Sequence, residues 1–120
     1  MRVFAKLKTQ SDYYNYNQPT AADFFRSVSH DGLKAALENI CRETEEAVRN
    51  GAAMVLLSDR YPQPGLTQIH ALLATGAIHA HLTRKQLRCD CNLLVETGTA
   101  RDSHHFACLI GFGATAVYPF

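Results

Sequence analysis

The sequence predicts an α/β fold in which helices alternate with the strands of a parallel sheet. From Asp31 onward, helical apolar spacing and short apolar runs follow each other in the order helix, strand, helix, strand, helix, strand. The first run, at residues 53–57, is apolar at every position, as is typical of a buried strand in a parallel sheet covered by helices. This alternation implies right-handed crossovers between neighbouring strands. A complete (β/α)8 barrel takes about 250 residues, so the chain is either a small open α/β unit or a slice of something larger, and we favour the slice.

Residues 1–30 form the least readable segment, and we expect them to be irregular and separate from a domain at residues 31–120. Val3, Ala5 and Leu7 alternate with other residues at a period of two, which is a weak strand signal. The polar and aromatic segment at residues 12–18 is typical of a loop, and Thr20 is a suitable cap for a short helix.

The first helix is predicted from Asp31, a suitable N-cap, to the stop at Asn50-Gly51. Its apolar face repeats every three to four positions: Leu33, Leu37, Ile40, Thr44, Ala47 and Val48. The strand at residues 53–57 follows and ends at Ser58-Asp59-Arg60.

A second helix is predicted over residues 68–86, after a loop rich in Pro and Gly at residues 61–65, with Thr67 as its cap. A strand at residues 92–95 comes next, and Asp102 or Ser103 caps a helix that runs to residue 110. Gly111-Phe112-Gly113 then has the spacing of a dinucleotide fingerprint, but a helix precedes it and a strand (residues 114–118) follows. We therefore interpret these glycines as a helix stop and a tight turn.

Composition excludes several classes of protein. Twelve basic and eleven acidic residues leave a formal charge of +1, which gives no electrostatic basis for binding nucleic acid or an anionic membrane. No apolar run approaches the roughly 18 residues of a membrane span, and no signal peptide is recognisable, so we expect a cytoplasmic chain. Its four cysteines are then expected to be reduced, largely structural thiols, with Cys89 and Cys91 on one side of a strand.

The candidate chemical groups lie at strand ends, where parallel α/β folds bind their ligands. Asp59, Arg60 and Glu96 are the strongest candidates for acid–base chemistry or anion binding. The alternative is structural: the carboxylates cap backbone amides or pair with Arg60 and Arg101. The histidines lack the spacing of a metal site, since His70 and His81 lie about 16 Å apart along one helix. We assign no catalytic, cofactor-binding or metal-binding residue.

Several segments form a distinctive collinear set: GLKAAL (32–37), LLSDR (56–60), ALLATGAIHAHL (71–82), LRCD (87–90), VETG (95–98), ARD (100–102) and HHFACLIGFGATAVYP (104–119). In this order they resemble the central domain of the glutamate synthase large subunit, which implies an α/β fold that resembles a partial or reduced (β/α) barrel. Together they cover about three quarters of the chain, from Gly32 to its end.

The resemblance implies a connecting segment of an oxidoreductase that makes two glutamates from glutamine and 2-oxoglutarate in ammonia assimilation. It also implies that FMN and an iron–sulfur cluster belong to other domains of that enzyme. The amidotransferase cysteine of the family would follow the initiator Met, where this chain has Arg2, so we expect that it too belongs to another domain. We therefore expect a fragment with a structural, interdomain role, inactive when isolated. The rival hypothesis is a free-standing α/β enzyme or ligand-binding module that uses Asp59, Arg60 and Glu96. A third possibility is self-association through exposed sheet edges.

Overall fold

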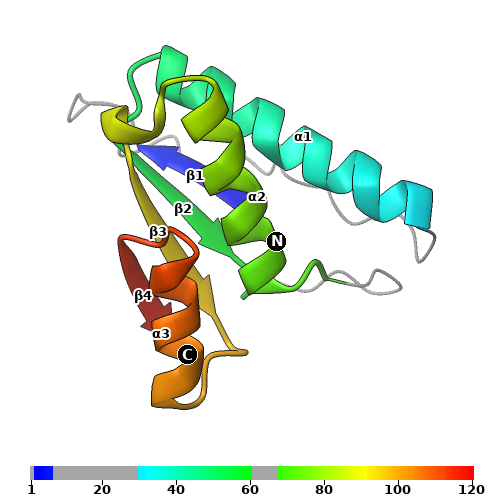
Figure 1. Ribbon diagram of the computed structural model, residues 1–120, viewed down its shortest axis with the longest axis vertical. Coiled ribbons are helices and arrows are strands. Elements are labelled where there is room, and N and C mark those ends of the chain that lie inside the picture. Colours follow the sequence, from blue (N-terminus) through cyan, green and yellow to red (C-terminus); the bar gives the residue numbers. More distant parts are fainter. Residues whose placement is uncertain (1, 7–29, 61–67) are drawn as a thin grey trace.

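The computed structural model describes residues 2–6, 30–60 and 68–120. In chain order these residues form β1 (Arg2–Lys6), α1 (His30–Arg49), β2 (Met54–Ser58), α2 (Ala71–Arg84), β3 (Asn92–Thr97), α3 (Ser103–Gly111) and β4 (Ala116–Pro119). A short 3-10 helix, η2 (Arg88–Asp90), leads into β3. Figure 1 shows α2 and α3 side by side over the strands that they connect, with α1 alongside α2.

The strands form one sheet in the order β1-β2-β3-β4. β2, β3 and β4 are parallel, whereas β1 pairs antiparallel with β2 at one edge. The predicted α/β alternation with a parallel sheet is confirmed. The weak strand signal at Val3 and Ala5 corresponds to β1, so residues 2–6 join the sheet and are not irregular. The predicted loop at residues 12–18, the helix capped by Thr20 and the loop at residues 61–65 lie outside the described residues.

One face of the sheet carries the hydrophobic core. Alternate positions on β2 and β3 point toward the helices and are fully buried: Val55, Leu57, Leu93 and Val95. Ile40 of α1 and Ile78 of α2 belong to the same core cluster. On the opposite face Leu56 and Leu94 are only half-buried. The described helices therefore cover one side of strands that the sequence predicted to be covered on both.

α2 begins at Ala71, three positions later than the sequence predicted. Its N-cap is His70, whose Nδ1 accepts a hydrogen bond from the backbone N–H of Leu72 at 3.2 Å. An imidazole nitrogen therefore caps the helix, whereas the sequence predicted the Thr67 hydroxyl in this role. Thr67 lies outside the described residues. The helix ends at Arg84. The predicted span of 68–86 is therefore too long at both ends.

The turn after α3 confirms the predicted helix stop. The N–H of Gly113 donates to the carbonyl of Ile110 and that of Ala114 to Leu109, both at 3.0 Å. This pair of bonds is the Schellman motif, which requires a left-handed residue after the helix. Gly113 supplies it with φ +112.

The other two helices end in the same way. α1 uses Gly51, with φ +95, as the sequence predicted. α2 uses Gln86, with φ +60, and the N–H of Leu87 reaches back to the carbonyl of Leu82 at 2.9 Å. No sequence signal identifies this third motif, because a glutamine stands where glycine is usual.

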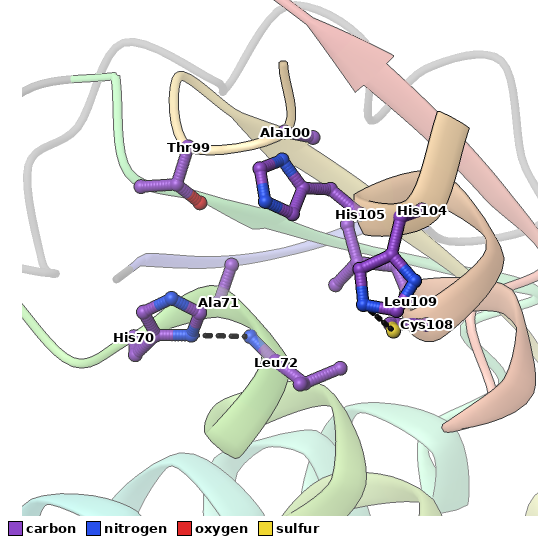
Figure 2. Close-up of a pocket in the computed structure, with 9 residues that line it drawn as sticks. All are labelled: His70, Ala71, Leu72, Thr99, Ala100, His104, His105, Cys108 and Leu109. Atoms are coloured by element: carbon purple, nitrogen blue, oxygen red, sulfur yellow. Dashed lines mark hydrogen bonds between the residues drawn. The ribbon is translucent and has the colours of Figure 1, made fainter. Parts of the chain in front are cut away.

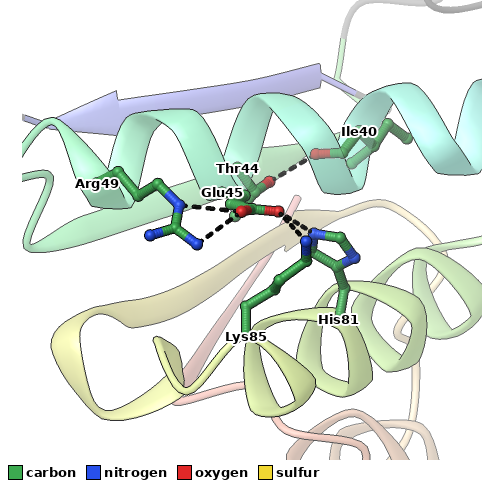
Figure 3. Close-up of polar contacts among 6 residues, drawn as sticks. All are labelled: Ile40, Thr44, Glu45, Arg49, His81 and Lys85. Carbon is green, nitrogen blue, oxygen red and sulfur yellow. Dashed lines mark hydrogen bonds and ion pairs between the residues drawn. The ribbon is translucent and has the colours of Figure 1, made fainter.

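Polar contacts join α1 to α2 in Figure 3. Glu45 accepts hydrogen bonds from Arg49 on its own helix at 2.9 Å and from His81 of α2 at 2.7 Å, with Lys85 at 3.6 Å. The hydrogen bond with His81, followed by that with Arg49, lowers the pKa of Glu45. Beside them, buried Thr44 turns its hydroxyl back to the carbonyl one turn earlier. Glu45 thus keeps its charge where the two helices meet.

Arg88 fastens η2 to the elements around it. Its Nε donates to His79 Nδ1 of α2 at 3.1 Å, its Nη1 to the carbonyl of Cys91 at 2.9 Å and its Nη2 to the carbonyl of Gly113 at 2.7 Å. The rigid guanidinium therefore links α2, the residue before β3 and the turn after α3.

Candidate functional site

The strand-end candidates lie where β2 and β3 finish side by side. Ser58 pairs with Glu96 in the parallel register, and the N–H of Asp59 continues the ladder to the carbonyl of Glu96 at 3.2 Å. Because side chains alternate along a strand, Asp59 points to the helix side, whereas Arg60 and Glu96 point to the opposite side. The sequence predicted that the three residues lie at one end of the sheet. It did not show that Asp59 lies on one face of the sheet and Arg60 and Glu96 on the other.

Asp59 holds the turn that follows β3. Its side chain is 8% exposed. Oδ2 accepts from the Thr97 hydroxyl at 2.5 Å, and Oδ1 accepts from the backbone N–H of Gly98 at 3.1 Å. Thr97 in turn lies 2.8 Å from the hydroxyl of Thr99. Both carboxylate oxygens of Asp59 are therefore engaged with the chain itself.

Glu96 is engaged in the same way on the other face. Arg60 Nε lies 3.1 Å from Glu96 Oε1, and the Ser58 hydroxyl donates to Oε2. The Arg60 guanidinium also sits 4.8 Å from the ring centre of Phe120 and 5.7 Å from that of Tyr118, within range for cation–π attraction. We call these five residues the outer cluster. It is an ion pair backed by aromatic rings.

These contacts decide between the two readings of the strand ends. A free-standing catalytic or ligand-binding site needs the three side chains to converge in one pocket, and the structure does not bring them together in that way. The structural alternative is confirmed for Asp59, which caps a backbone amide, and for Glu96, which pairs with Arg60. Within the described ranges Arg101 pairs with neither carboxylate; its N–H donates to His105 Nδ1 at 3.1 Å.

A cavity lies instead between the start of α2, the start of α3 and the loop after β3 (Figure 2). Its volume is about 220 Å³, and most of its wall is apolar. The polar side chains in the wall are those of His70, Thr99, His104, His105 and Cys108. His70 and His105 each use Nδ1 to accept from a backbone N–H.

Two further polar contacts organise the start of α3. Asp102 caps the helix by accepting from the N–H of His105 at 3.0 Å, and this bond is the main cause of the lowered pKa of Asp102. One turn further on, His104 Nε2 lies 3.6 Å from Cys108 Sγ. The spacing of four residues between His104 and Cys108 is visible in the sequence and is the signal from which this contact could have been predicted.

The four cysteines are free thiols in two kinds of environment. Cys41 and Cys91 are buried, and burial raises the pKa of each thiol, as expected of structural cysteines. Cys89 is exposed and Cys108 is half-buried. The expectation that Cys89 and Cys91 share one side of a strand is wrong, because Cys89 lies in η2 and the strand begins only at Asn92.

In the part of the chain that the structure describes, no three His, Cys, Asp or Glu side chains gather as a group able to hold a metal ion. None of the described helices is both long and apolar enough to cross a bilayer.

The fold and its strand ends define an α/β segment whose polar groups serve its own architecture. Residues 2–120 match the protein-family model described as the glutamate synthase central domain. The chain belongs to this family. The match reaches back through the first thirty residues, whereas the resemblance seen in the sequence began at about Gly32.

Curated relatives agree with the family match. The chain is 44% identical over 117 residues to the glutamate synthase [NADPH] large chain of Azospirillum brasilense, which covers 94% of this chain and 8% of that protein. It is 43% identical over 103 residues to ferredoxin-dependent glutamate synthase 2, chloroplastic, of Arabidopsis thaliana, covering 84% of this chain and 6% of that protein. The chain therefore spans only a small part of these relatives.

Proposed function

We propose that this chain acts as a connecting segment in the central domain of a glutamate synthase, an oxidoreductase of glutamate biosynthesis and ammonia assimilation. The observation that carries the proposal is the family match over residues 2–120, together with relatives that are named glutamate synthases. We propose a structural, interdomain role, because the strand-end carboxylates are used to hold the fold.

In the intact enzyme, glutamine and 2-oxoglutarate would yield two glutamates. By family resemblance, an amidotransferase domain releases ammonia, and a flavin domain reduces the iminoglutarate that forms. We propose that these two domains are the partners of this segment. FMN and the iron–sulfur cluster would belong to the flavin domain and its neighbourhood, and the chain itself would lie in the cytoplasm.

A chimeric enzyme tests the proposal. The matched segment of the Azospirillum brasilense large chain would be replaced by this sequence, and glutamine-dependent glutamate formation would be measured. We expect activity to persist with FMN bound, and the isolated 120-residue chain to show neither FMN binding nor glutaminase activity. Stoichiometric FMN binding, or ammonia release from glutamine, by the isolated chain would contradict the proposal.

Arg60→Met in the chimera separates a structural from a catalytic role of the outer cluster. A structural role predicts a lower melting temperature with unchanged activity per folded enzyme, since the guanidinium holds Glu96 and the aromatic rings. A catalytic role predicts lost activity at an unchanged melting temperature. Arg101→Met is the matched control, because Arg101 is exposed and its side chain pairs with neither strand-end carboxylate.

We further propose that the isolated chain self-associates weakly through the side of β4 that pairs with none of the described strands, since its other side pairs with β3. Pro119 ends this strand and removes one donor from its edge, which limits the strength of pairing. Size-exclusion chromatography over a range of protein concentrations would measure it, and a concentration-independent monomer would rule it out.

A further inference from the structure

The side chains of His104 and Cys108 lie on the cavity side of α3. Residues four apart on a helix are neighbours on its surface, so the imidazole and the thiol meet without any rearrangement of the backbone. Figure 2 shows the His104 ring turned toward the sulfur of Cys108, with Nε2 and Sγ 3.6 Å apart. Imidazole nitrogen and thiolate sulfur are the two ligands that zinc prefers in proteins.

The separation of these two atoms fits a tetrahedral ion. With Zn–S near 2.3 Å and Zn–N near 2.05 Å, a tetrahedral angle places the two ligand atoms about 3.5–3.6 Å apart. The pair is therefore already spaced as two corners of such a site. From this geometry we propose that His104 and Cys108 form a two-ligand site for Zn²⁺ or a similar borderline-soft divalent ion, with water at the remaining positions.

The surroundings of the pair suit a bound ion. The pair lines the wall of the cavity of about 220 Å³, which provides room for the ion and its waters. His104 is exposed and Cys108 half-buried, so an ion can reach both from solvent. Oxygen-preferring Mg²⁺ and Ca²⁺ are not expected to bind, because neither ligand is a carboxylate or carbonyl oxygen.

Titration of the reduced full chain with Co²⁺ tests the proposal, because a cobalt–thiolate bond gives a charge-transfer absorption band in the near ultraviolet. We expect one Co²⁺ per chain with this band, and competition by Zn²⁺ but not by Mg²⁺. Cys108→Ser should abolish the band, and His104→Ala should weaken binding at least about tenfold, since loss of even a second-shell partner of a metal ligand costs about 10–100-fold.

The chain offers matched controls and a rescue. Cys89→Ser alters an exposed thiol outside the pair, and His105→Gln alters the adjacent imidazole; both should leave the band and the affinity unchanged. Cys108→His should restore Zn²⁺ binding without the thiolate band, because it keeps two ligands four residues apart. Far-ultraviolet circular dichroism would check that each variant folds.

The decisive comparison is between the half-buried thiol of Cys108 and the exposed thiol of Cys89. A band that persists in Cys108→Ser, or that disappears equally in Cys89→Ser, would overturn the proposal, as would wild-type Zn²⁺ affinity no greater than that of Cys108→Ser.

Discussion

Adding a single methyl group at Gly113 is expected to lower the stability of the fold strongly. Its φ of +112 is a conformation that a residue with a Cβ rarely adopts, and forcing alanine into it costs about 1–3 kcal/mol. A Cβ at this position would also overlap His79 Nδ1. His79 is held in place by Arg88, so relieving the overlap costs a further 1–3 kcal/mol, roughly the usual range for overpacking. We expect Gly113→Ala to lower the free energy of unfolding by about 2–6 kcal/mol.

Equilibrium urea denaturation of the full chain, followed by far-ultraviolet circular dichroism, would measure this loss. With an m-value of about 1–3 kcal/mol/M, the urea midpoint should fall by about 1 M or more. Two other glycines divide the effect into its parts. Gly51 has φ +95 but open space around its Cβ position, so Gly51→Ala should show backbone strain alone. Gly111 has neither problem, so Gly111→Ala should be neutral or stabilising by up to about 1 kcal/mol.

The double variant His79→Ala/Gly113→Ala isolates the steric part. Removing the imidazole should make Gly113→Ala less costly, and a double-mutant cycle measures the difference. If Gly113→Ala costs no more than Gly51→Ala, or if the cycle shows no coupling, the inferred clash with His79 is wrong.

Three further changes test other parts of the fold. Gln86→Gly should stabilise the chain by about 0.5–1 kcal/mol in urea denaturation, because glycine adopts the left-handed turn without strain; equal or lower stability would contradict this. Arg88→Met should lower the free energy of unfolding by about 2–4 kcal/mol, since three acceptors lose their donor, and Arg88→Lys should recover only part of this loss. Glu45 has a lowered pKa, so its stabilisation is present above the ordinary glutamate value of about 4.3 and is lost as pH falls through its folded-state pKa. The urea midpoints of wild type and Glu45→Gln should therefore differ at neutral pH and converge in acid; a difference that does not depend on pH would refute the role of the charge.

Much of the fold could be predicted because its local signals agree with its packing. The apolar spacing of α1 places Ile40, Thr44 and Val48 inside, and all three are buried. The antiparallel position of β1 could not be predicted, because the alternation in five residues does not specify a partner strand or its direction. The capping of α2 by His70 could not be predicted either, because threonine is a preferred N-cap residue and histidine is not.

The strand-end site was predicted in location but not in geometry. The order of elements places Asp59, Arg60 and Glu96 at the carboxyl edge of the sheet, as the structure confirms. Whether they converge depends on alternation within each strand and on the register between strands, which sets Ser58 opposite Glu96 and Glu96 opposite Tyr118. Register is fixed by the packing of the whole sheet, so no local pattern reveals it.

The occupancy of the carboxylate oxygens explains why these strand ends serve the fold. Each of the four oxygens of Asp59 and Glu96 has a partner from the chain: a hydroxyl and an amide for Asp59, an ion pair with a guanidinium and a hydroxyl for Glu96. A substrate would have to share oxygens that already interact with the chain. The same groups that look catalytic in the sequence therefore stabilise two neighbouring strand ends. The connecting role that we propose would need that rigidity to hold neighbouring domains in fixed positions.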